Sequence, residues 1–197
     1  YTAFYTLSLH DALPIYSACP TNRTMTRPPD DGAARARNAH APAVALEDPR
    51  SAEARALVGA LDEYLDGLYP PENNYLLDVE SLCAPETSFF VARVGGMALG
   101  CAALRVLDAR CGELKRMYVA PEARGLGLGR ALLQAIEARA RALGLGELKL
   151  ETGTAQPEAL ALYRDAGFVP CAAFADYRPS PLNLFLAKPL QAGTRRH

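Results

Sequence analysis

The sequence is poor in lysine, carries almost no net charge and has no long hydrophobic run. Only three of its 21 basic residues are lysines, and the formal net charge is −1. Such a balance does not provide the polycationic surface that binds nucleic acid. No hydrophobic run reaches the roughly 18 residues that a membrane-spanning helix needs. We therefore expect a protein whose partner is a small molecule, and neither nucleic acid nor a membrane.

Metal-ligand patterns are also absent from the sequence. Its five cysteines form no CxxC pair and no Cys/His cluster with the spacing of metal ligands, and their number is odd. We interpret them as free thiols in a reducing cytosol. The sequence thus predicts no metal site and a cytoplasmic localisation.

A length of 197 residues favours a single domain. Residues 1–15 are rich in Tyr and Leu and lack Arg, unlike the Ala- and Arg-rich remainder; they resemble translated sequencing-adapter sequence, so we expect them to be foreign to the protein. Residues 16–43 show neither a helical nor a strand period, which predicts a disordered leader over 1–43. We expect the folded domain over 44–190 and a flexible tail over 191–197.

From residue 43 onward, the hydrophobic pattern changes repeatedly between strand and helix periods. The predicted strands cover 43–47, 87–93, 97–107, 111–119, 147–151, 168–175 and 182–187. The predicted helices cover 49–68, with Asp48 as the N-cap, 78–83, 128–143, and a short stretch that begins at Pro157 and ends before Gly167. In the helix over 128–143, the period places Leu132 and Ile136 inward and Glu137 outward. This order predicts a mixed α/β (α+β) fold, with helices on both faces of one sheet.

Alternating glycines precede the helix at 128–143, in the segment Arg124-Gly125-Leu126-Gly127-Leu128-Gly129-Arg130. Glycines let a ligand approach the backbone closely, and the N–H groups at the start of a helix attract anions such as a diphosphate. The spacing is not the GxGxxG dinucleotide fingerprint, and the GK[ST] of a P-loop is missing. Taken alone, the segment fits a glycine-rich turn without a ligand equally well.

Two motifs together resemble the GNAT superfamily of acetyl-CoA-dependent N-acetyltransferases, in particular its small bacterial members. They are Arg124-x-x-Gly127-x-Gly129 before the central helix and Leu162-Tyr163-x-x-x-Gly167-Phe168 at the end of a later one. The resemblance extends over about 44–190. It implies a GNAT fold, whose central, mostly antiparallel sheet of six to seven strands contains a splayed central strand pair. It also implies an acyltransferase that uses acetyl-CoA and no metal.

The resemblance further implies where acetyl-CoA binds. Its pantetheine is expected to pair with the backbone of 117–119, and its pyrophosphate to lie on the amides of 124–130. Gln156 stands about where many family members have an asparagine that contacts the cofactor. The expected cofactor-binding residues are Met117, Tyr118, Val119, Arg124, Gly125, Leu126, Gly127, Leu128, Gly129, Arg130 and Gln156. An ordinary core strand at 117–119 is compatible with this role, because the ligand uses only the backbone.

Glu113 is the candidate general base. An ammonium with a pKa near 10 must lose a proton before its nitrogen can attack a thioester. Several GNAT enzymes have a catalytic glutamate on the strand before the glycine loop, and strand alternation would place Glu113, Lys115 and Met117 on one face. The alternative interpretation is a solvated strand glutamate paired with a neighbouring basic residue.

Tyr163 is the candidate general acid. The matching tyrosine of many family members protonates the departing CoA thiolate, and the hydroxyl of Tyr163 would do the same. An isolated tyrosine at helical spacing is more often a core residue, so this assignment depends mainly on the motif.

The acceptor side is expected to include Glu151 first of all, then Thr152, Asp176, Tyr177 and residues 69–74 with Asn74, because carboxylates suit an ammonium substrate. The sequence therefore predicts direct transfer of the acetyl group to a small-molecule amine in a ternary complex. Two alternatives stay open, namely acetylation of a protein or peptide and a non-catalytic module that binds acyl-CoA. A homodimer is a further possibility, because GNAT proteins often dimerise.

Overall fold

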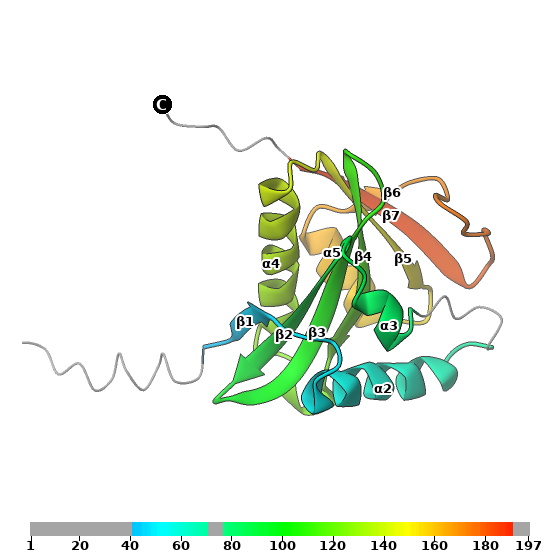
Figure 1. Cartoon of the computed structure of the whole chain (residues 1–197). Coiled ribbons are helices and arrows are strands. Elements are labelled where there is room, and N and C mark those ends of the chain that lie inside the picture. Colours follow the sequence, from blue (N-terminus) through cyan, green and yellow to red (C-terminus); the bar gives the residue numbers. More distant parts are fainter. Residues whose placement is uncertain (1–40, 71–76, 191–197) are drawn as a thin grey trace, which may run out of the picture.

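The computed structural model describes residues 41–70 and 77–190. Seven strands form one sheet in the order β1-β2-β3-β4-β5-β7-β6 (Figure 1). Every neighbouring pair is antiparallel except β4 and β5, which run parallel. The predicted mostly antiparallel sheet is thereby confirmed. The strands are β1 (Ala43–Leu46), β2 (Thr87–Val94), β3 (Met97–Val106), β4 (Cys111–Val119), β5 (Glu147–Gly153), β6 (Val169–Pro170) and β7 (Asn183–Pro189).

Helices cover both faces of the sheet, as predicted (Figure 1). One face packs against α2 (Ala52–Asp66) and the short α3 (Val79–Leu82). The other face packs against α4 (Leu128–Ala142) and α5 (Pro157–Asp165), and a 3-10 turn at Pro121–Ala123 leads into α4. Each face therefore has its own hydrophobic cluster, and the sheet lies between them.

The middle of β2, residues 89–92, is continuously hydrophobic because helices cover both faces of this strand. Phe89 and Val91 belong to the cluster under α2, whereas Phe90 and Ala92 belong to the cluster under α4. A strand that is covered on both faces has no solvent side, so the polar alternation of a surface strand is lost.

Two local expectations are wrong. The strand predicted over 168–175 is reduced to Val169–Pro170, because Pro170 has no N–H to donate and Ala175 has a φ of 48°, which is a turn conformation. Glu137 does not face outward; it is 8% exposed and its carboxylate binds Lys188 of β7 at 2.5 Å and Arg141 at 2.7 Å. Helical spacing alone could not show that β7 supplies a cation at that edge of α4.

Some expectations fall on residues outside the described part. The leader over 1–43, apart from 41–43, and the tail over 191–197 lie there, as does Cys19. The other cysteines, Cys83, Cys101, Cys111 and Cys171, are free thiols as predicted. Within 41–70 and 77–190, no helix is both long and apolar enough to cross a membrane.

Replacing Glu137 by Ala should lower the free energy of unfolding, because it leaves the Lys188 ammonium without its carboxylate. We expect a loss of about 1–2 kcal/mol, below the value for a fully buried pair since Lys188 keeps part of its side chain in solvent. Chemical denaturation measures this change. Gln134→Ala on the exposed side of α4 is the control and should change stability by less than about 0.5 kcal/mol. If the two variants are equally stable, the ion pair between Glu137 and Lys188 does not stabilise the protein.

Candidate active site

The site is built on the parting of β4 and β5. These parallel strands pair only where Cys111–Glu113 face Glu147–Lys149, although β4 continues to Val119 and β5 to Gly153. Beyond Glu113, the edge of β4 that faces β5 therefore has no strand partner. The structure thus contains the splayed central strand pair that the family resemblance implied.

A β-bulge bends β4 at this point. Arg116 and Met117 together oppose the single residue Ala102 of β3, and Arg116 has a φ of 54°. The guanidinium of Arg116 holds the bend, because it donates to the carbonyl of Leu77 (2.8 Å from Nε) and forms an ion pair with Asp62 of α2.

The bulge also breaks the side-chain alternation expected for β4. Glu113 and Lys115 both lie against Tyr177, on one face of the sheet, whereas Met117 packs into the cluster on the α4 face. The expectation that all three side chains share a face is therefore wrong for Met117.

A groove of about 450 Å³ runs from the bulge to the start of α4. Gly125 and Gly127 have φ values of 82° and 83°, so the chain turns sharply before the helix begins at Leu128. Gly129 lies in the first turn of α4, against Leu162 of α5. The groove is lined by every residue expected to bind the cofactor except Leu126, whose side chain is 52% exposed and points to solvent.

The groove includes residues that sequence reasoning missed. Leu61 and Tyr64 come from α2, and Glu158, Ala159 and Leu162 from α5. The Arg124 guanidinium lies 5.8 Å from the centre of the Tyr64 ring, which links the glycine loop to α2. No local pattern distinguishes these residues, since they reach the groove only through the packing of α2 and α5 across the sheet.

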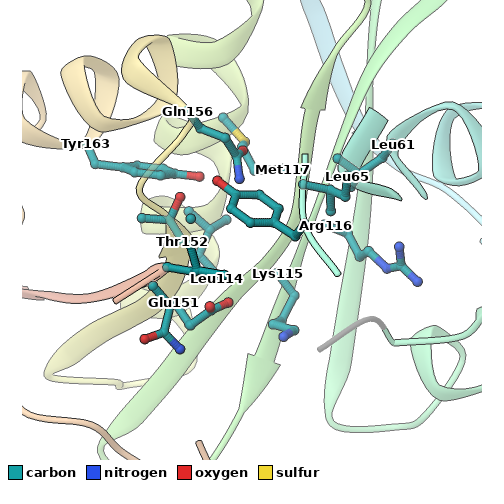
Figure 2. A pocket seen from close by; sticks show the side chains of 14 residues that line it. Leu61, Leu65, Leu114, Lys115, Arg116, Met117, Glu151, Thr152, Gln156 and Tyr163 are labelled. Carbon is teal, nitrogen blue, oxygen red and sulfur yellow. The ribbon is translucent and has the colours of Figure 1, made fainter. Parts of the chain in front are cut away.

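A second, smaller cavity of about 90 Å³ lies between the parted strands (Figure 2). Lys115 and Met117 of β4 line it on one side and Glu151 and Thr152 of β5 on the other. Figure 2 shows Tyr163 approaching from α5 and Leu61 and Leu65 from α2. Leu61, Met117 and Gln156 line both the cavity and the groove, so the two meet at these residues.

Glu113 lies behind this cavity rather than in its wall. Its side chain is almost completely buried, at 1% exposed, so the interpretation as a solvated strand glutamate is wrong. The Tyr177 hydroxyl donates to the Glu113 carboxylate at 2.5 Å, and Lys115 Nζ donates to the Tyr177 oxygen at 2.6 Å and lies 3.8 Å from Glu113. Lys115 is thus the member of this network that reaches the cavity.

Burial shifts the pKa values of the titratable groups around the cavity. It raises the pKa of Glu151 above its ordinary range, an effect that the nearby Lys115 ammonium partly offsets. Burial lowers the pKa of Lys115, whereas the negative charge of Glu113 acts in the opposite direction and raises it. Burial also raises the pKa of Tyr163 well above the ordinary value, so this hydroxyl keeps its proton across the neutral range.

The structure thus brings Tyr163, Glu151, Gln156 and the glycine loop to adjoining cavities, and leaves Glu113 one layer behind them. Asn74, another expected acceptor residue, lies outside the described residues. Among 41–70 and 77–190, no cluster of three His, Cys, Asp or Glu side chains could hold a metal ion.

Fold and site together define an acyltransferase of the GNAT class. Residues 54–168 match the model of the acetyltransferase (GNAT) family, and the chain belongs to this family. GNAT acetyltransferases use acetyl-CoA, and a GNAT acetyltransferase of Elizabethkingia anophelis, solved with acetyl-CoA bound, shares the fold (TM-score 0.54, 16% identity, covering 76% of this chain and 98% of that one).

Proteins with higher sequence identity to this chain are also named as acetyltransferases or acyltransferases. An "IAA acetyltransferase" of Azospirillum brasilense is 47% identical over 148 residues, which are 75% of this chain and 97% of the relative. An uncharacterized N-acetyltransferase of Bacillus subtilis, YsnE, is 36% identical over 69% of this chain and 93% of its own length. A candidate acyl-CoA N-acyltransferase of Klebsiella pneumoniae has a solved structure with a TM-score of 0.64 and 36% identity, covering 76% and 97% of the two chains.

Replacing Tyr177 by Phe should destabilise the protein, because the buried Glu113 carboxylate loses its hydroxyl donor. We expect the free energy of unfolding to fall by about 1–2 kcal/mol in chemical denaturation. Tyr64→Phe, which removes a hydroxyl at the rim of the groove, is the matched control and should stay within about 0.5 kcal/mol of the parent. A Tyr177→Phe protein as stable as this control would show that Glu113 does not depend on Tyr177.

Proposed function

We propose that this protein transfers the acetyl group of acetyl-CoA to the primary amine of a small molecule, by direct attack in a ternary complex. The amine nitrogen bonds to the thioester carbon, the carbon–sulfur bond breaks, and an amide and CoA are formed. In this proposal the groove beside the glycine loop holds acetyl-CoA, and the cavity between β4 and β5 holds the amine.

The observation that carries the proposal is the junction of the groove and the cavity. They share Leu61, Met117 and Gln156, so a thioester that ends the groove and an amine in the cavity would meet without crossing solvent. On the groove side, the segment 117–119 lies beyond the last residue of β4 that pairs with β5. Its backbone amides are therefore suited to pair with the pantetheine and to polarise the thioester carbonyl. The first turn of α4, after Gly127, would receive the pyrophosphate.

Glu151 is the better supported proton acceptor of the two candidate carboxylates. It lines the cavity, and its raised pKa brings it closer to the pKa of an ideal base at neutral pH. Glu113 contacts the cavity only through Tyr177 and Lys115. We therefore propose that Glu151 accepts the proton of the amine and that Glu113 positions Lys115.

Tyr163 is assigned to the departing sulfur. Its hydroxyl stays protonated, because burial raises its pKa, and can donate a hydrogen bond to the thiolate as the carbon–sulfur bond breaks. The buried ring packs against Phe168 at a centroid distance of 5.8 Å, which fixes the direction of the hydroxyl.

The space inside the cavity favours a small acceptor. It amounts to about 90 Å³, compared with about 450 Å³ for the groove, and the cavity is partly open to solvent. A single aminoalkyl group fits such a volume, whereas most of a peptide would lie outside it.

Calorimetric titration with acetyl-CoA, followed by thiol release in the presence of a panel of amines, tests the proposed function. The panel also includes IAA, because the relative from A. brasilense is named for it. Saturable binding with thiol release for a small amine is the expected result. Release only with peptides would favour a protein acetyltransferase. Binding without release from any acceptor would instead favour a non-catalytic acyl-CoA-binding module.

Replacing Tyr163 by Phe should lower kcat by about 100-fold, because the thiolate then leaves without a hydrogen-bond donor. The Kd of acetyl-CoA should change little, because the hydroxyl acts on the charge that develops on the sulfur only as the carbon–sulfur bond breaks, and Tyr163 does not line the groove. Steady-state kinetics and calorimetry measure the two quantities on the same preparation. A kcat equal to that of the parent would remove Tyr163 from the mechanism.

The pH dependence of kcat separates Glu151 from Glu113. A base acts only when deprotonated, so kcat should rise with pH through the pKa of Glu151, which burial places above the ordinary glutamate range. Glu151→Gln should remove this rise and lower kcat by about 100-fold. Glu113→Gln should keep the rise. The opposite pattern would make Glu113 the base.

A further inference from the structure

Tyr69 is a cavity residue to which the mechanism assigns no role. It follows α2 directly, where its backbone N–H donates to the carbonyl of Leu65 at 2.9 Å and continues the helical turn. Its side chain is 7% exposed and lines the cavity between the parted strands. It does not line the groove beside the glycine loop, unlike Tyr64 of α2.

The side chain of Tyr69 spans the cavity from α2 to the end of β5. Its hydroxyl oxygen accepts a hydrogen bond from the backbone N–H of Ala155 at 2.9 Å. Its ring lies against the backbone of Gly153, where the Cβ atom of any other residue would overlap the ring. Gly153 therefore provides the space in which the ring lies, and the Ala155 bond fixes the ring's position.

We propose that Tyr69 determines acceptor specificity, its ring being the wall that limits the cavity to small primary amines, with Gly153 making room for that wall. This inference rests on the proposed function. The ring and Gly153 both face the region that Lys115 and Glu151 border, so removing the ring enlarges the space beside the polar groups. The cofactor groove is not enlarged, because Tyr69 has no part in its lining.

Thiol release with propylamine and with 2-phenylethylamine tests the role of Tyr69. Tyr69→Ala should raise kcat/KM for 2-phenylethylamine relative to propylamine by about tenfold, because the space left by one ring accepts another. Tyr69→Phe should retain the selectivity of the parent, since the wall remains. The KM of acetyl-CoA should stay within about twofold of the parent value in both variants.

Tyr64→Ala is the matched control, because it removes a tyrosine ring that lies close by in the sequence but lines the groove instead of the cavity. It should change the KM of acetyl-CoA and leave the ratio between the two amines unaltered. Gly153→Ala provides a second test through stability. We expect it to lower the unfolding temperature when Tyr69 is present, and to have a much smaller effect in the Tyr69→Ala background, where no ring occupies the space.

The results separate failure of this inference from failure of the proposed function. An unchanged amine ratio in a folded Tyr69→Ala protein, or an equal loss of kcat/KM for both amines, would overturn the specificity role while the transferase function stands. If acetyl-CoA binds but neither the parent nor the variant acetylates any amine, the proposed function fails, and the inference with it. A tenfold change in the ratio at constant acetyl-CoA KM supports both.

Discussion

The parting of β4 from β5 is the constraint on which both cavities depend. β4 keeps its partner β3 along its whole length but loses β5 after Glu113. An unpaired strand edge exposes backbone N–H and C=O groups that can pair with another backbone. Here the bulge at Arg116 bends β4, and the bonds from Arg116 to Leu77 and Asp62 hold the bend in place. Helices α2 and α5, which lie on opposite faces of the sheet, both line the opening left between the strands.

Charged groups remain in this opening because they compensate one another. The nearly fully buried Glu113 carboxylate accepts from Tyr177 and lies close to the Lys115 ammonium. Burial disfavours the charge of Lys115, and Glu113 supports it. For Glu151, burial outweighs the opposing effects of the Lys115 charge and of the hydrogen bond with Asn183, so its pKa rises. Two carboxylates on neighbouring strands thus acquire different properties, one as part of a fixed network and one facing the cavity.

The parts of the site formed by contiguous residues could be predicted from the sequence. The glycine loop immediately precedes α4, as the sequence predicted, and the groove lies beside it. Side-chain directions on β4 could not be predicted, because one extra residue at the bulge reverses the alternation and moves Met117 to the α4 face. One partner of each buried carboxylate lies far along the chain: Lys188 of β7 binds Glu137, and Tyr177, before β7, binds Glu113.

The sequence by itself determined the order of strands and helices and the position of the glycine loop before α4, since both follow from local periodicity and glycine placement. Only the tertiary structure decided where β4 and β5 part, which carboxylate faces the cavity, and that Tyr69 lies against Gly153. These features depend on contacts between segments far apart in the sequence. Such contacts are fixed by how the layers pack, and no local pattern of residues records them.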